Sequence, residues 1–133
     1  MAFVLDASVA IAWFIRKQAT VYTDRMRLRA RREPLHVPAL WRLEVVNAVW
    51  TLQRRGGISV QAADTVVDLL SSLAVIEHAN EHSMHEMLAL TRRHGLSSYD
   101  ATYLALAYDL RLPLACKDKP LRNALSTAGV KLA

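Results

Sequence analysis

The chain opens on Phe3-Val4-Leu5-Asp6-Ala7-Ser8-Val9-Ala10, in which a short apolar run leads directly into an acid. The apolar run predicts a buried strand, and the residues after the acid predict a helix over 7–14. Similar extended pieces are expected at 35–38, 74–76 and 113–116. Short apolar strands separated by helices are typical of a parallel sheet between helical layers, so the sequence predicts an α/β domain of three layers.

Further helices are expected at 20–32, 39–55, 60–73, 81–93, 98–110 and 121–128, and a last short strand at 130–132. Gly56-Gly57 provides the C-terminal stop of the 39–55 helix. Three polar residues are expected to cap the helices that follow them, because their side chains accept hydrogen bonds from the first N–H groups: Ser59, Asn80 and Ser97. In the 20–32 helix, the residues expected to face the core are Val21, Met26 and Leu28.

The length and composition predict a single domain over residues 1–133. The chain is 53% hydrophobic and 22% charged, which excludes a disordered protein. A single cysteine, Cys116, excludes an internal disulfide and a Cys-based zinc site. No apolar run reaches the roughly 18 residues that span a bilayer, and the N-terminus lacks the basic region of a signal peptide. We therefore expect a cytoplasmic protein with no membrane contact.

Positive charge is concentrated near the N-terminus. The chain carries 17 Lys and Arg against 12 Asp and Glu, a formal net charge of +5. Seven of these cations lie between Arg16 and Arg32, where Asp24 is the only acid before Glu33. A basic stretch of this kind suits contact with a nucleic acid, but it is equally consistent with a solvated helix face. Both interpretations stay open.

Three acids are expected to meet at one edge of the predicted sheet. Asp6 directly follows the first strand, Asp118 follows the 113–116 strand by one residue, and Asp100 lies in the first turn of the 98–110 helix. In an open α/β sheet, ligands bind outside the carboxyl ends of the strands. Each acid also has an ordinary role open to it. Asp6 and Asp118 suit helix caps, and Asp100 suits a capping box with Ser97.

Glu44 is a fourth acid, on the 39–55 helix. Its neighbours three and four residues away on that helix are mostly apolar: Leu40, Trp41, Asn47 and Ala48. A carboxylate on such a face is expected to be buried, and burying it without a partner is unfavourable by several kcal/mol. No Lys or Arg falls at these spacings, so the partner is either a distant arginine or a divalent cation shared with other carboxylates. Hard cations such as Mg²⁺ take oxygen ligands of this kind.

The segments around the four acids resemble a known family, the PIN-domain proteins, and among them the VapC toxins of toxin–antitoxin pairs. The resemblance rests on the opening 3–10 segment and on three later motifs: Leu43-Glu44-Val45-Val46-Asn47, Ser97-Ser98-Tyr99-Asp100-Ala101 and Cys116-Lys117-Asp118. These motifs match in order and spacing over almost the whole chain. The resemblance implies a PIN-like fold with a central parallel sheet of four or five strands.

The same resemblance implies a metal-dependent endoribonuclease. Asp6, Glu44, Asp100 and Asp118 would be its catalytic metal ligands, for Mg²⁺ or Mn²⁺, and Ser8 would support Asp6 from the second shell. The family's usual Thr or Ser two residues before the fourth acid is Cys116 here, which departs from the pattern. The resemblance also implies an RNA substrate, a small VapB-like antitoxin and a homodimer. It does not identify the RNA that is cleaved or the antitoxin.

Two other classes of function remain as alternatives. A non-catalytic RNA- or protein-binding module would keep the fold without the chemistry, although the presence of all four acids argues against it. A receiver-like phospho-acceptor domain would also place acids at strand ends and would need a lysine such as Lys117 nearby. The inward-facing Glu44 has no place in such a site.

Overall fold

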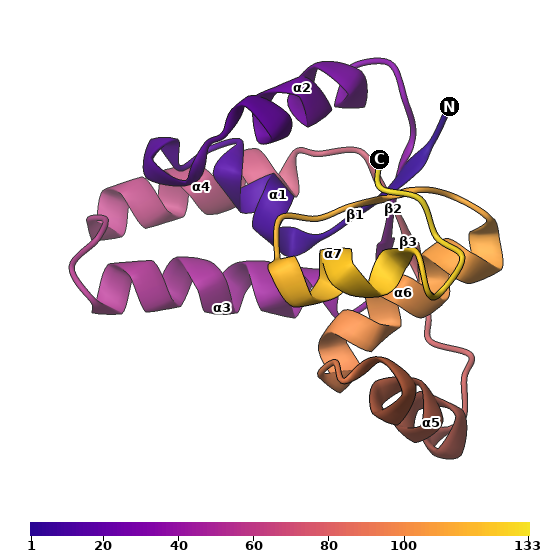
Figure 1. The fold of residues 1–133 in the computed structure, drawn as a ribbon. Coiled ribbons are helices and arrows are strands. Elements are labelled where there is room, and N and C mark those ends of the chain that lie inside the picture. The colour runs from indigo at the N-terminus through magenta and orange to yellow at the C-terminus, as the bar shows by residue number, and fades with distance from the viewer.

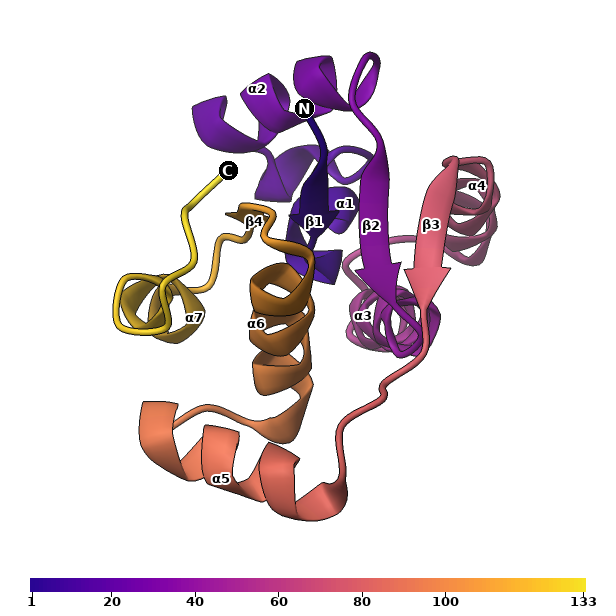
Figure 2. The same ribbon diagram turned by 90° about the vertical axis from the view of Figure 1, so that its right-hand side faces the viewer.

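A computed structural model that describes residues 1–133 contains one sheet of four parallel strands. The strands are β1 (Phe3–Leu5), β2 (Leu35–Pro38), β3 (Val75–His78) and β4 (Leu114–Ala115), and their order across the sheet is β3-β2-β1-β4 (Figure 2). The chain therefore adds β2 and β3 on one side of β1 and then returns to its other side for β4. In parallel α/β sheets this reversal of strand order leaves a crevice at the carboxyl ends.

Helices cover both faces of the sheet, which confirms the three-layer α/β prediction. The helices α1 (Ala7–Ala12), α3 (Trp41–Arg54) and α4 (Val60–Ser71) lie on one face, and α6 (Ser98–Leu110) packs on the other (Figures 1 and 2). The remaining helical segments are η1 (Arg16–Gln18), α2 (Val21–Ala30), α5 (Met84–His94) and α7 (Lys119–Leu125). None of the helices combines the length and the apolar character needed to cross a membrane.

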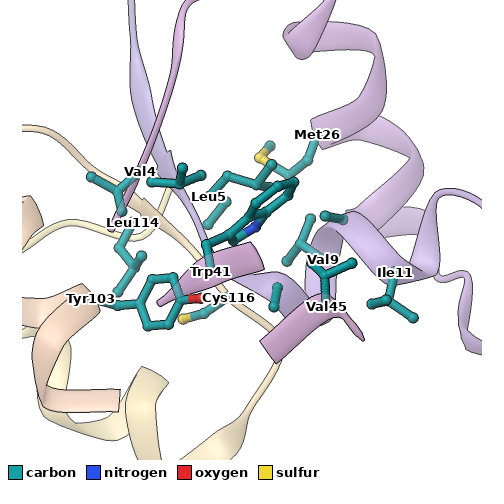
Figure 3. Close-up of a cluster of buried hydrophobic side chains, with 14 of the residues drawn as sticks. Val4, Leu5, Val9, Ile11, Met26, Trp41, Val45, Tyr103, Leu114 and Cys116 are labelled. Carbon is teal, nitrogen blue, oxygen red and sulfur yellow. The ribbon is translucent and has the colours of Figure 1, made fainter. Parts of the chain in front are cut away.

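The core forms where β1 and β4 meet the helices. Every residue of β1 is fully buried, as are Leu114 and Ala115 of β4. Parallel strands covered on both faces are expected to be continuously apolar, which explains these short unbroken apolar runs. Figure 3 shows Trp41 of α3 close to Leu5 of β1, with Tyr103 of α6 directed into the same cluster.

The side of α2 that faces the core differs from the prediction. Met26 is buried as expected, but Val21 and Leu28 are 83% and 60% exposed. The other buried residue of α2 is Thr23. A capping box explains this register, because the Thr23 side chain bonds Thr20 at the start of the helix. The Thr23 carbonyl then accepts a hydrogen bond from the buried Trp13 indole at 2.8 Å.

The start of α5 was also predicted wrongly. The helix begins at Met84, capped by Ser83, rather than at residue 81 after Asn80. The Asn80 side chain instead accepts a hydrogen bond from the His82 backbone at 3.0 Å and forms a local turn. The predicted caps Ser59 and Ser97 are confirmed. The 130–132 strand is reduced to a single bridge between Leu114 and Leu132.

Two helix ends in the same left-handed conformation allow a paired test of stability. Gly95 ends α5 at φ 62°, and Arg111 ends α6 at φ 55°. A side chain in this region is strained by about 1 kcal/mol or more. Gly95→Ala is expected to lower the free energy of unfolding by about 1 kcal/mol, and Arg111→Gly to raise it by up to about 1 kcal/mol. Urea unfolding measures both, and shifts of the same sign would contradict the argument.

Candidate active site

Asp6 lies where β1 passes into α1. Its backbone N–H donates to the Ala115 carbonyl of β4 at 3.0 Å, which fixes the ends of the two strands together. Its carboxylate caps α1, because Oδ2 accepts hydrogen bonds from the Ser8 backbone N–H at 3.3 Å and from the Ser8 hydroxyl. The side chain is only 6% exposed. Asp6 is therefore a buried carboxylate held in one orientation by Ser8.

The four predicted acids line one hollow of about 400 Å³. Asp6 reaches it from the end of β1, Glu44 from the first turn of α3, Asp100 from the first turn of α6, and Asp118 from the residue that precedes α7. The hollow thus lies at the reversal of strand order between β1 and β4. Its other lining residues are Ala7, Ser8, Ile11, Gln18, Asn47 and Ala48.

Glu44 has no cation beside it. Its Oε1 atom is buried and has no hydrogen-bond partner. None of the chain's ion pairs includes Glu44, so the alternative of a distant arginine partner is not realised. Burial raises the pKa of this carboxyl, and the Asp100 carboxylate raises it further. The Tyr103 hydroxyl lies close enough to lower this pKa, although the two groups do not meet hydrogen-bond geometry.

Burial and mutual repulsion also act on the other acids. Burial raises the pKa of Asp6 to about 6, against the lowering effect of the Ser8 hydrogen bond, and Glu44 and Asp100 add to the increase. The pKa of Asp100 is raised by burial and by the Asp118 carboxylate. Like charges that share a poorly solvated site disfavour the ionised forms. The hollow therefore gathers negative charge that the protein itself does not neutralise.

The carboxylates of Asp100 and Asp118 do not act as helix caps. Ser97 accepts a hydrogen bond from the Asp100 backbone N–H at 3.1 Å, but no return bond joins the Asp100 carboxylate to the Ser97 backbone, so the capping box is incomplete. Asp118 occupies the cap position of α7 and its side chain makes no capping bond. Both carboxylates remain available to the hollow.

The sequence of the chain is similar to those of known proteins. A model of the PIN domain family matches residues 3–124. The chain belongs to the PIN-domain family. Proteins named Ribonuclease VapC3 are similar to it: one from Pyrobaculum aerophilum is 29% identical over 91% of this chain and 92% of its own length. Another, from Mycobacterium tuberculosis, is 31% identical over 94% of this chain and 88% of its own.

The fold of this PIN chain is also similar to a solved structure. The crystal structure of PAE2754 from Pyrobaculum aerophilum superposes with a TM-score of 0.70, at 24% identity, over 92% of this chain and 78% of that one. At this identity the likeness concerns the fold alone. The family match and the named relatives confirm the resemblance to VapC-type PIN proteins that the sequence motifs indicated.

The donor set of this PIN domain suits a hard divalent cation. All four acids offer carboxylate oxygens, and the Glu44 Oε1 atom lacks a partner. Burial and the neighbouring carboxylates raise the pKa values of Asp6, Glu44 and Asp100. As the side chains stand, no group of three or more His, Cys, Asp or Glu residues has the spacing to hold a metal ion. Binding would therefore require the carboxylates to turn toward a common point within the hollow.

Two further residues, Cys116 and Gln18, lie near the acids. Cys116 is fully buried at the end of β4, and burial together with Asp6 raises the pKa of its thiol to about 12. The thiol forms no hydrogen bond with any of the acids, so any support that it gives them is indirect. Gln18 lines the hollow but was not predicted, since it comes from a short turn with no motif around it.

Proposed function

We propose that this PIN domain is an endoribonuclease that requires Mg²⁺ or Mn²⁺ and acts as the toxin of a VapBC-type pair. The observation that carries the proposal is the hollow in which Asp6, Glu44, Asp100 and Asp118 converge without a neutralising cation. The similarity to proteins named Ribonuclease VapC3 supplies the class of substrate. We place its action in the cytoplasm, on RNA.

In this proposal the four acids hold the metal and Ser8 keeps the Asp6 carboxylate oriented toward it. A divalent cation bound there would supply the positive charge that activates water and stabilises the scissile phosphate. Glu44 and Asp100 approach from different helices, so they would bind from two sides of the hollow. Asp118 is the exposed acid of the set.

The test is RNA cleavage by the purified protein with and without metal. We expect single-stranded RNA to be cut in millimolar Mg²⁺ or Mn²⁺, because carboxylate sites that keep several metal-bound waters bind these ions weakly, and to remain intact in excess EDTA. Calorimetric titration with Mn²⁺ separates this proposal from the non-catalytic module, which would bind no metal in the hollow. Cleavage that persists in EDTA, or a protein that binds no Mn²⁺, would contradict the proposal.

A homodimer and a small VapB-like antitoxin belong to the same proposal. On α3, the apolar side chains Leu43, Val46 and Trp50 recur at helical spacing on one face and are all more than half exposed. Such a stripe suits contact with another protein surface. Light scattering checks the dimer, because a particle of 14.9 kDa would be a single chain. Co-purification with the small protein encoded beside the gene checks the antitoxin.

A further inference from the structure

One wall of the hollow is a short turn rather than a major helix or strand. The η1 segment, Arg16–Gln18, lies between α1 and α2 (Figure 1), and its last residue, Gln18, lines the hollow with the four acids. The backbone hydrogen bonds of the turn are local, from Gln18 N–H to Ile15 and from Ala19 N–H to Arg16. These bonds shape the turn but do not attach it to the site.

Lys117 makes that attachment. Its Nζ donates a hydrogen bond to the Gln18 carbonyl at 2.8 Å, across 99 positions of sequence. It is the only hydrogen bond between residues 16–18 and a distant part of the chain. Lys117 is half-buried and directly follows Cys116, which is fully buried. Its ammonium group forms no ion pair with any carboxylate, so its contact with the turn is its one defined interaction.

The turn carries two cations that nothing else in the chain uses. Arg16 and Lys17 are exposed, and no hydrogen bond or ion pair joins either side chain to another residue. Of the other cations, Arg27 donates to the Trp13 carbonyl and Arg122 to the Cys116 carbonyl, whereas Lys119, which follows Asp118, is exposed and makes no such bond. Arg29 pairs with Glu33. Free positive charge is therefore found on the turn that borders the acids.

An RNA strand needs such charge at this place. The four carboxylates repel phosphates, and the binding of nucleic acids depends mainly on Lys and Arg contacts with the backbone. We infer that the Arg16–Gln18 turn holds the single RNA strand beside the scissile phosphate, and that Lys117 is a positioning residue that keeps the turn at the hollow. This inference rests on the proposed ribonuclease function.

The first experiment measures RNA binding without cleavage. Fluorescence anisotropy with a labelled single-stranded oligoribonucleotide in EDTA compares the wild type, R16Q/K17Q and a control, R92Q/K131Q, which removes the same charges from exposed residues of α5 and the C-terminal segment. Loss of two phosphate contacts is expected to make the salt slope shallower by about 1.4 and to weaken binding by about 25-fold at 0.1 M salt. Equal losses in the control, or no loss in R16Q/K17Q, would overturn the inference.

The second experiment tests the positioning role. K117M removes the hydrogen-bond donor to the Gln18 carbonyl and is expected to weaken RNA binding by between about 5- and 25-fold. K117R keeps a donor at this position and is expected to retain most of the wild-type affinity. In metal, K117M should raise KM by a similar factor while kcat changes by about twofold or less. A K117M variant that binds RNA like the wild type, or a K117R variant as weak as K117M, would overturn the role.

The two proposals fail in different ways. Turn-dependent RNA binding without metal-dependent cleavage would remove the ribonuclease proposal and support the binding surface. Normal cleavage together with unchanged binding by R16Q/K17Q would remove the binding surface alone.

Discussion

Asp6→Asn and Asp100→Asn are each expected to reduce metal-dependent RNA cleavage by more than about 100-fold. Losing a residue that only supports a metal ligand reduces activity by up to about 100-fold, and losing a ligand itself should have a larger effect. Asparagine keeps the size of the side chain but removes the negative charge that would bind the cation. The fold is expected to persist, because the amide oxygen introduced at position 6 can still accept from Ser8 and the Ser97 cap uses only the backbone of residue 100. Initial cleavage rates at several Mn²⁺ concentrations measure the effect.

The matched control is Asp64→Asn, an exposed aspartate on α4 that makes no ion pair. It removes the same charge away from the hollow and should cleave RNA at the wild-type rate. Far-ultraviolet circular dichroism confirms that all variants are folded. If D6N and D100N cleave as fast as D64N, the assignment of the site is wrong, even if the protein proves to be a ribonuclease.

The fold was predictable where one physical requirement dominates. A strand buried on both faces must be apolar throughout, so Phe3–Leu5 was found from its composition alone. Leu35–Pro38 was found because the residue before a proline avoids the helical region. The caps Ser59 and Ser97 were found because a helix start needs side-chain acceptors. The position of β4 beside β1 follows from no local pattern, since it depends on how distant segments pack.

Prediction failed where two local requirements compete. Asn80 suits a helix cap, but Ser83 lies three residues further on and takes that role, while Asn80 forms a turn. Apolar side chains on a surface helix are usually assigned to the core, yet Val21 and Leu28 are exposed because the capping box turns Thr23 inward. The energetic difference between such alternatives is small, on the order of 1 kcal/mol, and tertiary contacts decide between them.

The convergence of the four acids on one hollow was predictable for a physical reason. Glu44 has mostly apolar neighbours on its helix, and a buried carboxylate needs a partner that compensates its charge. No residue nearby in the sequence provides one. The structure places its Oε1 atom without a partner in the same hollow as the other three acids. Gln18 could not be found in this way, because an amide in a turn is an ordinary feature and the contact of this turn with Lys117 joins residues 99 positions apart.

The raised pKa of Asp6 predicts that the metal-free protein becomes less stable as the pH rises from about 4 to about 7. Asp6 ionises at about 6 in the folded protein and near 3.8 as an isolated side chain, so the folded state binds this proton more tightly. Its contribution to stability is complete below pH 3.8 and is lost as the pH rises through about 6. A difference of this size corresponds to about 3 kcal/mol in the free energy of unfolding.

Urea unfolding in EDTA at several pH values measures this loss, and Asp6→Asn is the comparison that isolates it. The D6N variant cannot ionise at this position, so its stability should exceed that of the wild type by a margin that grows to about 3 kcal/mol near pH 7. Parallel curves for the two proteins would contradict the argument. Saturating Mn²⁺ should reverse the order, since it stabilises only the protein that has the ionised carboxylate. The ionised Asp6 carboxylate would then both destabilise the metal-free fold and help to bind the metal. Both effects arise because its negative charge is buried in the hollow without a compensating cation.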